Sequence, residues 1–215
     1  MKLQARNTSL FPLLVAFYAF ISIGMKAGLL NIGWTYMQDT FEVSLESLSI
    51  VLAALMLGTL LATFSSGRVI AQIGMGSSLI IGSLITIVGL VGYMLSPSFE
   101  ILVLAVFVTA TGSAMIDAGM NVFVSANYTS GPLNWLHAFF GVGLTMGPAL
   151  MTIIVVNLDA SWRWGYVVAL VLQVILIGLF VFNRNYWKIS YEDIETPGKS
   201  SSAGFWETLR LPAVI

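Results

Sequence analysis

Residues Phe99–Ala126 have the sequence FEILVLAVFVTATGSAMIDAGMNVFVSA, an apolar stretch long enough to cross a bilayer as one helix. Asp117 lies within it and is its only formal charge beyond Glu100. Lys26 is likewise the only formal charge in a second apolar stretch, Leu10–Met37. An ionised side chain at the middle of a spanning helix costs about 2.5–3.5 kcal/mol on insertion scales, and such residues usually line a water-filled path or carry protons. These two stretches predict a membrane-spanning fold with a functional interior.

The composition is typical of a membrane protein. Of the 215 residues, 58% are hydrophobic and only 9% are charged, whereas a soluble domain carries about 25% charged residues. The net charge of −1 gives no basis for binding nucleic acid. Cysteine is absent, and neither paired carboxylates nor a nucleophile triad is evident. We therefore expect no enzyme activity and no cofactor.

Six apolar stretches reach the length of about 20 residues that a spanning helix needs. They are roughly twice as long as a barrel strand and do not alternate in polarity, so we expect an all-α polytopic membrane protein. The stretches are Leu10–Met37, Leu48–Ile73, Ser77–Leu95, Phe99–Ala126, Leu133–Leu158 and Trp164–Asn183. The predicted organisation is a six-helix transmembrane bundle at 1–184, a polar cytoplasmic linker at 185–204 and the start of a seventh transmembrane helix at 205–215.

Basic residues predict the orientation. With the N-terminus inside, the outer face holds only Arg163, and the cytoplasmic face holds Lys2, Arg6, Arg68, Arg184, Lys188, Lys199 and Arg210. This distribution follows the positive-inside rule and predicts a multi-pass protein of the cell (inner) membrane with a cytoplasmic N-terminus. The first apolar stretch is longer than the 7–15 residues of a signal-peptide core and predicts a retained helix.

Two short motifs accompany this layout. Gly67–Gly74 (GRVIAQIG) follows the second stretch, and Ser161–Tyr166 (SWRWGY) precedes the sixth. The chain resembles the N-terminal half of a major facilitator superfamily transporter, whose signature between helices two and three is Gly-x-x-x-Asp-Arg-x-Gly. Both glycines match, while Ala71 and Gln72 replace the acid and the base. The resemblance implies a six-helix half with a 3+3 inverted repeat, a C-terminal six-helix half as partner, and gating residues at Gly67, Arg68 and Gly74.

A narrower resemblance rests on Met115–Asn121 (MIDAGMN) and Leu133–His137 (LNWLH). These segments are similar to the fucose/proton symporter branch, in which a helix-four acid lies four residues before an Asn and a Leu-Asn pair opens helix five. The resemblance implies that Asp117 is the proton-coupling acid. It also places Asn121 and Asn134 among the residues that contact the solute.

The charged residues leave alternatives open. A carboxyl in an apolar, intermittently hydrated cavity can exchange protons near neutral pH. Asp117 is therefore a proton-coupling candidate, and the alternative is a buried acid neutralised by a fixed partner. Lys26 has three alternatives: it pairs with Asp117, it meets an anionic or polar group of the substrate, or it snorkels to the outer interface.

Three further residues are weaker candidates. His137 is a candidate proton relay, and the alternative is a hydrated interfacial histidine. It is the only histidine, so no metal site is predicted. Asn31 stands where the symporter branch carries a helix-one acid. With Trp34 it is a candidate for solute contact, since amides bind hydroxyl groups and indoles stack on sugar faces.

The sequence favours a secondary active transporter that carries out proton-coupled symport of a small polar, sugar-like solute by alternating access. Its partners would be the solute, protons, the lipid bilayer and a C-terminal half in the same chain, a split partner or a second copy. One alternative is a proton-coupled multidrug efflux antiporter, because Gly143–Pro148 partly resembles the helix-five signature of those proteins, although Val108 stands where they carry an arginine. Another is a non-transporting membrane receptor or assembly subunit.

Overall fold

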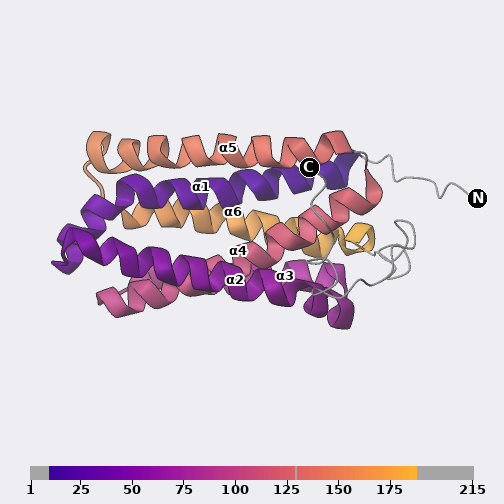
Figure 1. Ribbon diagram of the computed structural model, residues 1–215. Coiled ribbons are helices and arrows are strands. Elements are labelled where there is room, and N and C mark those ends of the chain that lie inside the picture. The colour runs from indigo at the N-terminus through magenta and orange to yellow at the C-terminus, as the bar shows by residue number, and fades with distance from the viewer. Residues whose placement is uncertain (1–9, 129, 188–215) are drawn as a thin grey trace, which may run out of the picture.

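The computed structural model describes residues 10–128 and 130–187, and within these ranges it is a bundle of six long helices without strands (Figure 1). Short helical segments flank them: η1 (Leu45–Ser47), the π-helical η2 (Ile153–Asn157) and η3 (Arg184–Trp187). The long helices are α1 (Leu10–Phe41), α2 (Leu48–Ile73), α3 (Met75–Leu95), α4 (Phe99–Asn127), α5 (Ser130–Thr152) and α6 (Arg163–Phe182). The all-α prediction is confirmed.

Each of these six helices is long and apolar enough to cross a membrane. The predicted boundaries are close to the observed ones, with two differences. Helix α1 continues to Phe41, and α5 begins at Ser130, so that Pro132 lies in its first turn. Proline is tolerated there because the N–H that it lacks would have no intrahelical partner. The predicted seventh helix, and the linker beyond residue 187, lie outside the described residues.

Successive helices run in opposite directions because their connections are short. Gly74 alone joins α2 to α3 and has φ +81°, a left-handed conformation that glycine adopts without steric cost. Figure 1 shows this turn at the same end of the bundle as the start of α1, and the α3–α4 and α5–α6 connections at the other end. Neighbours in space are not always neighbours in sequence: α1 packs mainly along α5, α4 along both α2 and α3, and α3 along α6.

The α1–α5 crossing brings two backbones into direct contact. A Cβ on Gly147 of α5 would lie 2.5 Å from the Met25 carbonyl oxygen, and a Cβ on Gly143 would lie 2.8 Å from the Met25 nitrogen. On α1, Gly24 and Gly28 face α5 in the same way. Small residues spaced by four allow this approach between transmembrane helices.

The glycine face of α1 also fixes where Lys26 lies. At 100° per residue, Lys26 is about 200° around the helix from both Gly24 and Gly28. Because those glycines lie against α5, the lysine emerges on the opposite side of α1, toward the bundle interior. There it is 7% exposed.

Arg163 ties the start of α6 to the end of α3. Its Nε donates to the Met94 carbonyl oxygen at 3.1 Å, and its Nη2 donates to the Ser96 carbonyl oxygen at 2.8 Å. The guanidinium also lies 4.6 Å from the centre of the Trp162 ring. Charged hydrogen bonds of this kind are stronger than neutral ones, so the Ser161–Tyr166 motif has a structural role at this end of the bundle.

We expect Gly143→Ala to destabilise the protein, because the added methyl group meets the α1 backbone and overpacking costs about 1–3 kcal/mol. Gly141→Ala, on the same helix, is the matched control. Its Cβ meets nothing within 4 Å, and replacing glycine by alanine in a helix stabilises by up to about 1 kcal/mol. Thermal unfolding in detergent, followed by tryptophan fluorescence, should show a lower midpoint for Gly143→Ala only. Equal effects of the two substitutions would contradict the close crossing.

We expect both Arg163→Ala and Arg163→Lys to lower the unfolding midpoint, because lysine keeps the charge but cannot reproduce the two-pronged donation to the end of α3. Arg68→Ala, at an exposed position on α2, should change stability by no more than about 0.5 kcal/mol. Full retention of stability in Arg163→Lys would show that charge alone, and not the paired donors, matters at this position.

Candidate functional site

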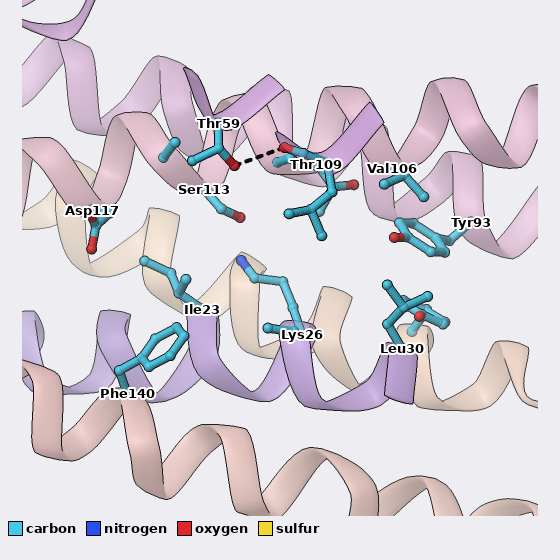
Figure 2. Close-up of a pocket in the computed structure, with 15 residues that line it drawn as sticks. Ile23, Lys26, Leu30, Thr59, Tyr93, Val106, Thr109, Ser113, Asp117 and Phe140 are labelled. Carbon is cyan, nitrogen blue, oxygen red and sulfur yellow. Dashed lines mark hydrogen bonds between the residues drawn. The ribbon is translucent and has the colours of Figure 1, made fainter. Parts of the chain in front are cut away.

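A cavity of about 310 Å³ lies between α1 on one side and α2 and α4 on the other. Its wall is mainly apolar and includes two charged side chains, Lys26 from α1 and Asp117 from α4. Figure 2 shows Lys26 reaching from α1 toward α4, with Asp117 displaced along the helix axis from it. The other polar or aromatic residues of the wall are Thr59, Tyr93, Thr109, Ser113, Phe140 and Tyr166.

Helical periodicity explains the polar side of this cavity. Thr109, Ser113 and Asp117 are spaced by four residues, and residues four apart share one face of a helix. Asn121 continues the series, and its Nδ2 donates to the Asp117 carbonyl oxygen of its own helix at 3.0 Å. One face of α4 thus borders the cavity with Ser113 and Asp117, while the hydroxyl of Thr109 on the same face lies against Gly89 of α3.

Lys26 is held by a neutral partner. Its Nζ donates to Oε1 of Gln173 on α6 at 2.8 Å, and the glutamine is fully buried. No carboxylate lies within 4.0 Å of the ammonium in the described part of the chain. In this conformation Lys26 neither pairs with Asp117 nor snorkels to the outer interface, and its amine faces the cavity without an acidic partner among the described residues.

Asp117 is half-buried at the other end of the cavity wall. The His137 ring on α5 is exposed and meets Phe20 edge-on, with 5.9 Å between the ring centres. It does not line the cavity, and no hydrogen bond or ion pair joins it to Asp117 in 10–128 and 130–187. Of the three predicted proton-coupling residues, the structure therefore places Asp117 and Lys26 in the cavity wall, and not His137. In 10–128 and 130–187, no cluster of three metal-ligating side chains is present.

The predicted solute-contacting residues are not gathered at this cavity. Asn31 is exposed on another face of α1, and Asn134 is exposed on α5. Trp34 is buried in the apolar core, with its ring centre 6.4 Å from that of Phe99. None of the three lines the cavity, and Asn121 is bonded to its own helix.

The predicted gating residues lie at one end of the bundle. Gly67 and Arg68 are exposed near the end of α2, and Gly74 forms the turn into α3. They line no part of the cavity between α1 and α4.

Sequence reasoning missed Ser113, Thr109 and Gln173. The four-residue spacing from Thr109 to Asp117 could have identified the two hydroxyl residues. Gln173 is the only amide within the apolar α6. A single amide in an apolar helix could likewise have identified it as a candidate from the sequence. The stacking of Tyr93 on Tyr166 at the cavity wall, with ring centres 4.1 Å apart, had no counterpart in the sequence pattern.

Comparisons with known proteins agree with this architecture. Residues 13–215 match the family model of the Major Facilitator Superfamily. Among the solved structures, the chain is similar to a mutant form of the peptide transporter POT in complex with alafosfalin, with a TM-score of 0.66 and 15% sequence identity. That match covers 81% of this chain and 38% of the peptide transporter, so the chain spans well under half of that protein's length. No curated protein matches.

The family model covers nearly the whole chain, and the six-helix bundle has the fold of half a transporter of this kind. At 15% identity the structural similarity concerns the fold alone. The chain belongs to the major facilitator superfamily, whose members carry small solutes across membranes.

Proposed function

We propose that this chain forms the N-terminal half of a proton-coupled secondary transporter, in which Asp117 is the proton-linked group. The observation that carries the proposal is the position of this carboxyl in the wall of an interior cavity, on a helix whose other cavity-facing residues are uncharged. Intramembrane carboxylates in such positions typically belong to ion or substrate pathways.

Water in the cavity would carry protons to and from the Asp117 carboxyl. At about 30 Å³ per water molecule, its volume of about 310 Å³ is large enough for several waters beside the Asp117 carboxyl. When the cavity opens to one side of the membrane, the hydrated carboxyl takes up a proton. When it opens to the other side, the proton is released, and rocking of the two halves exchanges the two states.

The transport cycle requires a second half. A six-helix counterpart would cover the cavity and form the other wall of the substrate site, in the same polypeptide, in a split partner or in a second copy. The described basic residues fit a cytoplasmic N-terminus, because Arg68 and Arg184 lie toward the end of the bundle where α1 begins and Arg163 lies toward the other end. The corresponding location is the cell (inner) membrane.

Symport of a small polar solute is the form of transport that we propose. Resemblance to the fucose/proton symporter branch suggests a sugar-like solute, but the residues expected to bind a sugar lie outside the cavity. The efflux alternative rested on the glycines of α5, and those glycines contact the α1 backbone. Their packing role accounts for them without a drug pathway.

We expect Asp117→Asn to abolish accumulation driven by a pH gradient, because the amide cannot carry the transported proton. The measurement is uptake of a panel of sugars and organic acids into proteoliposomes that contain the complete transporter. Facilitated exchange without a gradient should persist in the variant. The control is Asp39→Asn, at an exposed position near the end of α1, which should accumulate solute normally. Accumulation that survives in Asp117→Asn would mean that protons couple elsewhere.

A further inference from the structure

We propose that the cavity between α1 and α4 binds the anionic group of a small organic acid through Lys26, with Gln173 as the positioning residue. The binding group is an oxyanion such as a carboxylate or a phosphonate. This inference rests on the proposed transport function and names the class of its solute.

Lys26 has no counter-ion among the described residues. The Lys26 ammonium has three N–H donors, and one of them is used, in the bond to Gln173. Removing a charge from water without a partner costs several kcal/mol. A carboxylate would normally balance a buried lysine, yet within 10–128 and 130–187 none lies within 4.0 Å of it. A buried lysine avoids this cost either by releasing its proton or by gaining an anion, and the remaining donors of the protonated form match an anion that enters and leaves.

The residue that holds the lysine, Gln173, is neutral. Oε1 of Gln173 fixes the position of Nζ but cancels no charge. A glutamate at this position would form a permanent ion pair and remove the attraction for a mobile anion. The fully buried amide therefore positions the cation and leaves it available to a ligand.

A second polar group, the Ser113 hydroxyl, lies on the opposite wall of the cavity. Figure 2 shows the Ser113 hydroxyl on α4 and the Lys26 ammonium on α1 pointing toward the same space. The Ser113 oxygen has no hydrogen-bond partner among the described residues. An oxyanion between the two walls would accept from both the ammonium and the hydroxyl, and charge-assisted hydrogen bonds of this type are the strong ones.

The rest of the cavity restricts the body of the solute. Ile23, Leu30, Leu55 and Phe140 supply apolar walls. A polyhydroxylated sugar would leave hydroxyl groups without partners against these side chains, at a cost for each one. The volume of about 310 Å³ is at the lower end of the range of about 300–1,000 Å³ for ligand pockets. Both features favour a small acid with an apolar body.

Asp117 links this anion site to the proton. It lines the same cavity, and its ionised carboxylate repels an anion at Lys26, while the protonated form does not. The proton and the anion therefore favour each other's binding, and this coupling is reciprocal, so the doubly loaded state that symport uses is favoured.

The test is isothermal titration calorimetry on the complete transporter in detergent, without any gradient. The probes are matched pairs that share one body: benzoate with benzamide, propionate with propionamide, and phenylphosphonate as a second oxyanion. Fucose and glucose are the sugar probes. We expect at least one acid of the panel to bind and its neutral partner not to bind. Lys26→Met should weaken this acid by at least about tenfold, the loss that follows from removing a charged hydrogen bond.

Gln173→Glu separates binding from stability. It keeps a partner for Lys26, so the unfolding midpoint should hold, but it supplies a fixed counter-ion and should abolish acid binding. Arg184→Gln, at an exposed position outside the cavity, should bind the acid as the wild type does. Asp117→Asn should also retain acid binding, so loss of gradient-driven accumulation in that variant concerns the proposed function alone.

Three outcomes would overturn the inference: no acid binds, the acids bind equally to Lys26→Met, or Gln173→Glu binds them undiminished. Sugar binding that is unaffected by Lys26→Met, with no binding of the acids, would restore the sugar-like solute while leaving proton coupling through Asp117 intact.

Discussion

Direct backbone contact between α1 and α5 is the constraint on which the interior depends. Gly24 and Gly28 on α1 meet Gly143 and Gly147 on α5 without intervening side chains, so α1 has one permitted rotation in the bundle. That rotation turns Lys26 away from α5 and toward α4. The position of the cation is thus a consequence of helix packing, and any side chain added at these glycines would also move the charge.

The two intramembrane charges have different surroundings. Lys26 is anchored by a buried, neutral amide from α6, while Asp117 is half-buried in the α4 wall of the cavity. Because they are not paired in this conformation, each is available to another partner. In the proposed symport cycle, Lys26 would bind the anionic solute and Asp117 would carry the proton, so one cavity would accommodate both.

Features that depend on local sequence patterns, such as the number of helices and their ends, were predicted from the sequence. Apolar length predicts six helices within a few residues of their observed ends, and Asp117, the only formal charge of Phe99–Ala126 beyond Glu100, predicts a carboxyl at an interior cavity. The Lys26–Gln173 bond joins residues 147 positions apart and depends on how the helices pack, which no local pattern reveals. Asn31 is five residues from Lys26, about 140° around the helix, so it lies on another face of α1, and its contact with the solute stays a prediction.

The proposed transport cycle requires water to reach the cavity wall, and cysteine labelling measures this access. The chain has no cysteine, so Ser113→Cys would place a single thiol of this chain at the cavity, and Ser83→Cys would place one at a fully buried position of α3. In membranes, a water-soluble methanethiosulfonate reagent should modify the first thiol and leave the second unmodified. If Ser113→Cys is as unreactive as Ser83→Cys, the cavity is dry and neither a proton nor an anion reaches it.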